Sequence, residues 1–160
     1  MNLSTKGRYA VMAMVDLASH SSGRPVALNE IAQRQEISLS YLEQLFARLR
    51  RGGLVLSARG PGGGYRLARP ADETRISDIM IAVDEPLKAT RCEIGSSRGC
   101  TGQQGRCVTH DLWEELGRQI HIFLSSVTLA DVVNKRVLGI SRSVEIPMTS
   151  EPAPAKDAAE

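Results

Sequence analysis

Apolar residues recur at helical spacing from the start of the chain. Between residues 6 and 19 they follow one another at intervals of three and four, which predicts an amphipathic helix with one buried face. The residues of this face are Ala10, Ala13, Met14, Leu17 and Ala18. A shorter stretch with the same period covers about 28–35, and a third begins after the polar break QEIS. The pattern therefore predicts three helices before residue 53.

The third stretch carries signals for both of its ends. Ser40 is followed by Glu43 three residues later, which is the capping-box pattern, so we expect the helix to begin near Ser40. Gly52 and Gly53 are expected to end it. Its apolar stripe consists of Leu42, Leu45, Phe46 and Leu49.

A β-hairpin is predicted directly after these glycines. Two short runs of strand-forming residues, LVLS and GYRL, flank a tip rich in glycine and proline, ARGPGGGY. Three helices followed by a hairpin is the order of elements in a winged helix-turn-helix, in which a short turn joins the second and third helices.

The second half of the chain predicts three more helices. Ser77 is the expected N-cap of the first, Thr109 begins a long helix that ends near Ser126, and Thr128 begins a short last one. From residue 147 the composition cannot support a core, which is typical of a disordered tail. The apolar side of the long helix consists of Leu112, Trp113, Leu116, Ile120, Phe123, Leu124 and Val127.

Charge is distributed unevenly along the chain. The formal net charge of +2 divides into +5 over residues 1–75 and −3 over residues 76–160. A basic first half suggests a polyanionic partner, although ordinary surface solvation is an equal alternative. No stretch approaches 18 consecutive apolar residues, so no membrane-spanning segment is expected. Three cysteines are an odd number, which fits a reducing cytoplasm better than a disulfide framework.

The winged-helix prediction identifies candidate DNA contacts on the third helix. Burial of the leucine stripe leaves Ser40, Tyr41, Gln44 and Arg48 on or near its open face, where hydroxyl, amide and guanidinium groups reach bases or phosphates. Two alternatives stay open: Tyr41 packing on the body of the domain, and Arg48 lying on a solvated helix end. Glu43 is awkward for DNA binding, because phosphates repel a carboxylate unless it accepts a hydrogen bond from cytosine.

The hairpin tip is a second candidate contact. Arg59 precedes the segment GPGGG, and Tyr65 follows it. Glycines permit positive φ angles and close backbone approach, so an arginine on such a tip can enter a minor groove. The alternative is a plain glycine-rich loop. The wing glycines are Gly60, Gly62, Gly63 and Gly64.

All three cysteines lie in one polar stretch between the two halves. Seven residues separate Cys92 from Cys100, six separate Cys100 from Cys107, and His110 follows two residues after Cys107. Structural zinc sites normally contain close pairs of cysteines, and a disulfide would leave one thiol unpaired. Iron–sulfur clusters are held by cysteine thiolates, and histidine can replace one of them. The spacing favours a cluster and leaves zinc and a disulfide as alternatives.

Several long strings in this sequence resemble the iron–sulfur cluster regulators, a family of winged helix-turn-helix transcription factors. They are LSTKGRYAVMAMVDLA, ISLSYLEQLFARLRRGGLV, RGPGGGYRLARP, AVDEP and CVTHDLW, and the similarity extends over about residues 1–138. The resemblance implies a cytoplasmic, homodimeric DNA-binding regulator, mainly a repressor and not an enzyme. It would sense cluster status through a 2Fe–2S cluster and control cluster-assembly genes.

The resemblance also implies which residues form the sites. The cluster ligands would be Cys92, Cys100, Cys107 and His110. Glu43 would help to separate two classes of operator. The intervals between the cysteines are longer than in the best-known members, so a 4Fe–4S cluster, as in related iron- or nitric-oxide-sensing regulators, is an alternative, and so is a zinc-bound regulator. The implied DNA contacts are Ser38, Ser40, Tyr41, Glu43, Gln44, Arg59 and the wing glycines.

Together these observations predict a mainly α protein with a small β-hairpin wing and a long dimerisation helix. Residues 1–85 are expected to form a winged helix-turn-helix DNA-binding domain, and residues 86–110 a cluster-binding loop. Residues 111–140 would form the dimerisation helix and a short C-terminal helix, and residues 141–160 the disordered tail. The expected partners are double-stranded DNA and a second copy of the chain, with no membrane.

Overall fold

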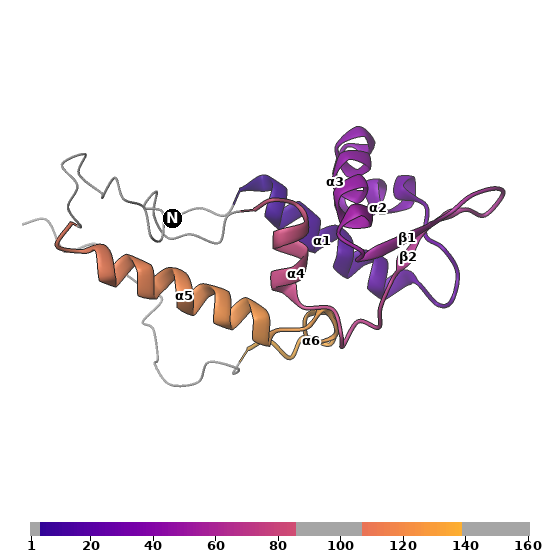
Figure 1. Ribbon diagram of the computed structural model, residues 1–160. Coiled ribbons are helices and arrows are strands. Elements are labelled where there is room, and N and C mark those ends of the chain that lie inside the picture. Colours follow the sequence, from indigo (N-terminus) through magenta and orange to yellow (C-terminus); the bar gives the residue numbers. More distant parts are fainter. Residues whose placement is uncertain (1–3, 86–106, 139–160) are drawn as a thin grey trace, which may run out of the picture.

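A computed structural model describes residues 4–85 and 107–138. The N-terminal part contains α1 (Thr5–His20), α2 (Leu28–Gln35), α3 (Leu39–Arg51), β1 (Val55–Ala58), β2 (Gly64–Leu67) and α4 (Ile76–Ala82). The C-terminal part contains α5 (His110–Ser126) and α6 (Leu129–Val133) (Figure 1). The two strands form an antiparallel hairpin in which Val55 pairs with Leu67 and Ala58 with Gly64. The prediction of a mainly helical protein with a β-hairpin wing is confirmed. Cys92, Cys100 and the tail at 141–160 lie outside the described residues.

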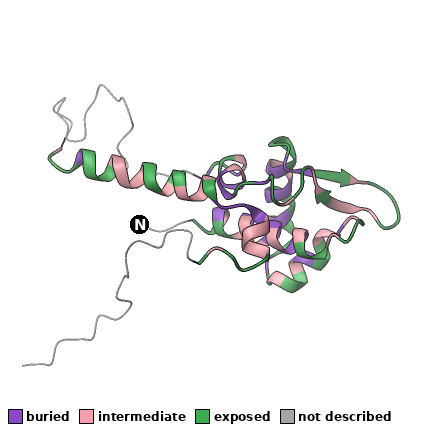
Figure 2. Ribbon diagram, turned by 90° about the horizontal axis from the view of Figure 1, so that it is seen from below, coloured by how far each residue is buried: buried purple, intermediate pink, exposed green. Residues whose placement is uncertain are grey.

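The core forms around α1. The apolar face predicted for this helix is buried, with Ala10, Ala13, Met14 and Leu17 at 0% exposure. The stripe of α3 packs against it, and so do α2, α4, β2 and α6. Figure 2 shows the buried residues gathered in this part of the molecule, while α5 extends away from it. The segment around Val127 and Leu129 therefore shares one core with the winged-helix elements.

The predicted start of the third helix is confirmed, but its predicted cap is wrong. Helix α3 begins at Leu39, next to Ser40, because the Ser38 carbonyl accepts hydrogen bonds from the Tyr41 and Leu42 amides. No side chain caps this end, so the capping box of Ser40 and Glu43 does not form, and both residues are exposed. The spacing of Ser40 and Glu43 predicted a side-chain cap, but the turn at Ser38 begins the helix without one.

Helix α4 likewise begins before its predicted cap. Its N-cap is Arg75, and Ser77 lies buried within the helix. The reason is a contact with the second half of the chain. Arg75 forms a β-bridge with Thr128, the Ile76 amide donates to Val127 O at 3.0 Å, and the Leu129 amide donates to Thr74 O at 2.8 Å. This pairing holds residue 75 in an extended conformation and sets the helix start.

The other two predicted starts are confirmed. Thr128 begins α6 with a complete capping box, in which its hydroxyl accepts from the Asp131 amide at 3.0 Å and the Asp131 carboxylate accepts from the Thr128 amide. Thr109 is the N-cap of α5, although its side chain makes no capping hydrogen bond.

A buried carboxylate ties α1 to α2. Asp16 is 3% exposed and accepts two hydrogen bonds from Arg34 Nε, at 3.0 and 3.1 Å, and one from Arg34 Nη2 at 2.6 Å. Gln35 Nε2 donates to the same carboxylate at 2.7 Å. Burial raises the pKa of Asp16, but the hydrogen bonds from Arg34 and Gln35 and the charges of Arg34 and His20 outweigh it, so the pKa is lowered. This hydrogen-bond network fixes where α2, the helix that precedes α3 in the chain, lies on α1.

We expect Asp16→Asn to lower the free energy of unfolding by about 2 kcal/mol, because the amide removes charge-assisted hydrogen bonds from a buried site. Chemical denaturation at neutral pH measures this. Glu30→Gln is the matched control. Glu30 contacts the same arginine at 3.7 Å but its side chain is 59% exposed, so its loss should cost less than about 0.5 kcal/mol.

The stability difference between the wild type and Asp16→Asn should depend on pH. A carboxyl whose pKa is lowered in the folded state stabilises the fold above its unfolded pKa of about 3.9, and this stabilisation is lost as the pH falls through the folded value. The stability advantage of the wild type over Asp16→Asn should be constant above about pH 5 and shrink below about pH 4. An advantage that grows on acidification would contradict this assignment.

Candidate nucleic-acid interface and metal centre

The first turns of α3 present a polar surface to solvent. Ser38, Ser40, Glu43 and Gln44 are all exposed there, on the side opposite the buried leucine stripe. The structure thus brings together four of the predicted DNA contacts at one helix N-terminus. Backbone amides and the helix dipole at such an end favour phosphate oxygens.

Two aromatic residues predicted as DNA contacts pack their rings against other aromatic rings. The ring of Tyr41 is partly buried and meets Tyr9 edge to face, with ring centres 6.1 Å apart. The ring of Tyr65 meets Phe46 in the same way at 4.9 Å, and its backbone pairs with Val26 through two hydrogen bonds of 2.8 Å. Both tyrosines therefore contribute to the packing that holds α3 and the hairpin in place.

The wing tip is a tight glycine turn that exposes Arg59. The Gly63 amide donates to Gly60 O at 2.9 Å, and Gly60 and Gly62 have positive φ angles of 96° and 74°. Gly64 is required for a different reason. A Cβ at this position would overlap the carbonyl of Val26, so only glycine lets β2 lie against the segment that precedes α2.

The two residues that precede the cysteine stretch are anchored to the winged-helix part. The Asp84 carboxylate pairs with Arg48 of α3, and its carbonyl accepts from Lys6 Nζ at 2.7 Å. Arg48, predicted as a phosphate contact, is thus already engaged by a carboxylate. Its side chain remains 38% exposed.

Glu85 caps the first helix from the far end of this domain. It is 7% exposed and accepts from the Ser4 amide at 2.9 Å and from the Ser4 hydroxyl. Burial raises the pKa of Glu85, but the hydrogen bonds from Ser4 and Gly7 and the charge of Lys6 outweigh it, so the pKa is lowered. Gly7 leaves room for this carboxylate, because a Cβ at position 7 would come within 2.9 Å of Glu85 Cγ.

Two of the four predicted metal ligands lie at the start of α5. Cys107 is half-buried, His110 is 8% exposed, and the His110 amide donates to Cys107 O at 3.0 Å. The other two, Cys92 and Cys100, lie outside the described residues. A thiolate and an imidazole are both soft or borderline donors, which suit iron–sulfur and zinc chemistry. The donor set in the described part therefore fits the predicted cofactor.

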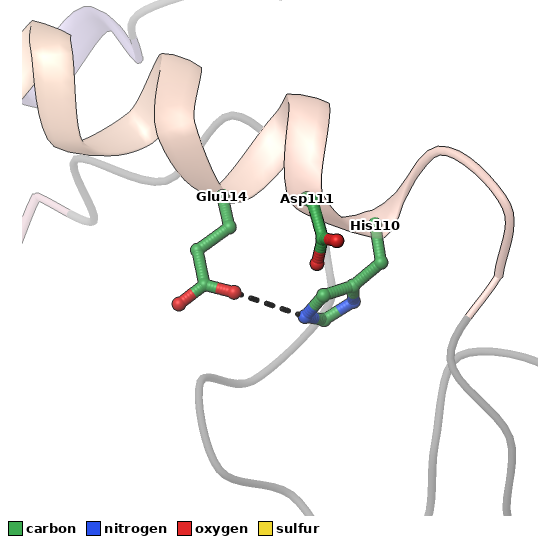
Figure 3. A group of neighbouring side chains, drawn as sticks. All are labelled: His110, Asp111 and Glu114. Atoms are coloured by element: carbon green, nitrogen blue, oxygen red, sulfur yellow. Dashed lines mark ion pairs between the residues drawn. The ribbon is translucent and has the colours of Figure 1, made fainter.

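Thr109 and Glu114 supply the side chains that lie next to these two donors. Trp113 Nε1 donates to the Thr109 hydroxyl at 3.2 Å, and that hydroxyl lies 3.8 Å from Cys107 Sγ. His110 Nε2 lies 3.2 Å from Glu114 Oε2 (Figure 3). Asp111 belongs to the same group of neighbouring side chains, whose ligand atoms lie within 4.8 Å of one another. Outer partners of this kind orient the ligands of metal sites.

Comparison with known proteins gives the family. A family model described as "Rrf2: Iron-dependent Transcriptional regulator" matches residues 3–135. The chain belongs to the Rrf2 family. Among curated relatives, the HTH-type transcriptional regulator IscR of Serratia proteamaculans is 54% identical over 136 residues, which cover 85% of this chain and 81% of the relative. IscR of Yersinia enterocolitica is 53% identical with the same coverage.

Solved structures of Rrf2 regulators share this fold. The structure titled T. potens IscR has a TM-score of 0.68 and 41% identity, and the alignment covers 85% of this chain and 88% of that one. CymR of B. subtilis, titled a global cysteine regulator, has a TM-score of 0.70 and 32% identity, with coverage of 84% and 98%. Since the family model is described as iron-dependent and this neighbour is titled a cysteine regulator, the Rrf2 fold alone does not determine what such a protein responds to.

Sequence reasoning missed four contacts around these two sites of the Rrf2 protein. The pairs Arg48–Asp84 and Ser4–Glu85 join residues 36 and 81 positions apart, and no local pattern marks them. The pairs Thr109–Trp113 and His110–Glu114 are four residues apart on one helix, so their spacing could have identified them as neighbours. Within the described residues, no helix is long and apolar enough to cross a membrane.

We expect Gly64→Ala to detach the base of the wing from Val26 and to cost about 2–3 kcal/mol of stability, because the added methyl overlaps a carbonyl that cannot move freely. Hydrogen exchange would show faster exchange of the Val26 and Tyr65 amides, which bond across this contact. Gly62→Ala is the control: its Cβ would meet nothing within 4 Å, so only backbone strain of about 1 kcal/mol is expected and both amides stay protected. Equal deprotection in the two variants would contradict the steric argument.

Proposed function

We propose that this chain is a DNA-binding transcriptional regulator, mainly a repressor, that senses iron–sulfur cluster status through a 2Fe–2S cluster and controls cluster-assembly genes. The observation that carries the proposal is the presence in one chain of an exposed winged-helix surface and a thiolate–imidazole donor pair. The 53–54% identity to proteins named IscR supports it. We place its action in the cytoplasm, where thiols stay reduced, and propose no catalytic role.

For DNA binding, we assign direct contacts to the exposed polar residues. Ser38, Ser40 and Gln44 at the start of α3 would enter the major groove, and Glu43 would discriminate among base sequences by its charge. Arg59 and the wing glycines would approach the minor groove or the phosphates. Tyr41, Tyr65 and Arg48 would act from the packed edge of this surface, where they hold its shape.

For the cofactor, we assign Cys92, Cys100, Cys107 and His110 as ligands. A bound 2Fe–2S cluster would supply a one-electron redox centre. Binding or loss of the cluster would change the charge at the start of α5. The chain's own contribution is to present a thiolate and an imidazole at the start of α5, where the Thr109 hydroxyl lies near the sulfur. Hydrogen bonds to ligand sulfurs are one means by which proteins tune cluster potential.

The coupling between the two sites would run through residues 84 and 85. Asp84 pairs with Arg48 on the DNA-facing helix, and Glu85 holds the N-terminus of α1. Both directly precede the stretch of residues 86–110 that we assign as the cluster-binding loop. A change in the forces on that stretch would therefore reach α3 through this ion pair, in addition to the packing of α4 on α3.

We further propose that α5 pairs with α5 of a second copy. The helix extends away from the core (Figure 1), and along its length His110 alone is buried among the residues of this helix. The first part of its apolar side stays open, with Leu112 61% exposed and Trp113 40% exposed, while Phe123 and Leu124 near its end pack against the core. A second copy related by two-fold symmetry would cover this side and set two winged helices at a fixed spacing on a two-fold operator.

Leu116→Glu should convert the dimer to a monomer, because it introduces a charge into the apolar side of α5. We expect the dissociation constant measured by sedimentation to rise by more than about a hundredfold, which corresponds to about 3 kcal/mol. His121→Glu adds a similar side chain at an exposed position on the other side of the helix and should leave association unchanged. Monomeric wild-type protein at micromolar concentration would refute the assignment.

Two measurements test the proposal as a whole. Footprinting at moderate salt should reveal protected sites near cluster-assembly promoters, and Arg59→Ala should weaken this binding about tenfold or more. No protection in either the cluster-loaded or the cluster-free state would contradict a regulator.

Iron, acid-labile sulfide and zinc analysis of anaerobically purified protein should give two irons and two sulfides per chain. Four irons would instead assign the 4Fe–4S regulators, and zinc without sulfide the zinc-bound type.

A further inference from the structure

We propose that Glu114 is a positioning residue for His110: its carboxylate holds Nε2–H of the imidazole and thereby selects Nδ1 as the nitrogen that binds iron. This inference rests on the proposed role of His110 as a ligand. It adds a specific outer partner that determines how that ligand is oriented and how strongly it donates.

The geometry places the pair one helical turn apart. His110 is the first residue of α5 and Glu114 lies four positions later, so both side chains project from the same side of the helix. The distance from His110 Nε2 to Glu114 Oε2 is 3.2 Å, and Figure 3 shows the carboxylate directed at the ring nitrogen. The histidine side chain is 8% exposed and that of Glu114 is 34% exposed, so water competes weakly for this hydrogen bond.

The chemistry follows from the tautomers of imidazole. A neutral ring that donates from Nε2–H carries its lone pair on Nδ1, and a metal ligand needs that lone pair. Metal-bound histidines commonly donate their other N–H to a carboxylate, which fixes the ring orientation and makes the ligand more basic. A more basic ligand gives more electron density to the iron and favours the oxidised cluster.

Neighbouring carboxylates do not offer the same arrangement. Glu115 is the next residue, but its carboxylate pairs with Arg118 and accepts from Gln119 at 2.6 Å, away from the histidine. Asp111 lies in the same group as His110, but the ion pair with the imidazole is made by Glu114. Glu115 is therefore a matched control, with the same charge on the same turn and without the contact.

The first part of the test needs no cofactor. Nitrogen-15 NMR of the cluster-free protein reads the tautomer of each histidine from its ring-nitrogen shifts. We expect His110 in the Nε2–H form in the wild type and in Glu115→Gln. Glu114→Gln should keep this form, because the amide oxygen still accepts the hydrogen bond from Nε2–H. Glu114→Ala should lose the preference.

The second part uses the cluster-loaded protein at one fixed pH. Glu114→Ala should lose its cluster about ten- to a hundredfold faster than the wild type. Glu114→Gln should hold the cluster but shift its reduction potential upward, because the partner has lost its charge. Glu115→Gln should match the wild type in both measurements. A merely structural Glu114 would alter stability without moving the potential.

The possible failures are distinguishable. If Glu114→Ala keeps the wild-type tautomer, the wild-type potential and the wild-type rate of cluster loss, the role of Glu114 is overturned while His110 remains a candidate ligand. If the tautomer changes but the potential, the spectrum and the rate of cluster loss do not, His110 is not a ligand, and both this inference and the ligand assignment fail.

Discussion

The apolar face of α1 is the surface on which the rest of the core depends. Ala10 and Ala13 are small enough to let neighbouring helices approach closely, and Met14 and Leu17 fill the space between them, all at 0% exposure. Helices α2, α3, α4 and α6 and strand β2 all pack on this helix. Because one face serves so many partners, the position of α3 relative to the wing is set by a shared core and not by the short turn that joins α2 to α3. Asp16 also fixes the orientation of α2 on α1, since its carboxylate binds Arg34 and Gln35 at the end of α2.

Polar contacts at the edge of this core connect it to the proposed sensing site. Glu85 accepts a hydrogen bond from Ser4 at the N-terminus of α1, and Asp84 pairs with Arg48 of α3. These two carboxylates are therefore the last contacts of the winged-helix part before residue 86. Charged contacts at an exposed edge are weaker and more adjustable than apolar packing. A signal that acts on residues 86–110 would therefore perturb the exposed Arg48–Asp84 pair more readily than the buried Glu85 contact.

Side chains at the start of α5 contact both described donors. Cys107 lies near the Thr109 hydroxyl, to which Trp113 of the following turn donates, and His110 lies beside the Glu114 carboxylate of that turn. Helical spacing makes this arrangement available to a short stretch of sequence, because residues four apart share a face. A ligand group can thus be oriented by its own helix even though that helix extends away from the core.

Much of this could be predicted from the sequence, because the period of apolar residues is a local property of helices and strands. Together with capping and turn signals, it predicted the six helices of the described residues, the hairpin, the faces of α1 and α3, and Thr128 as a helix start. The spacing of Cys107 and His110 predicted two donors close together. The tertiary structure alone decided the rest. Pairing of Arg75 with Thr128 moved the start of α4, and packing turned Tyr41 and Tyr65 inward. Asp84 and Glu85 found partners 36 and 81 residues away, because a contact between distant segments depends on how helices pack and leaves no periodic trace in the sequence.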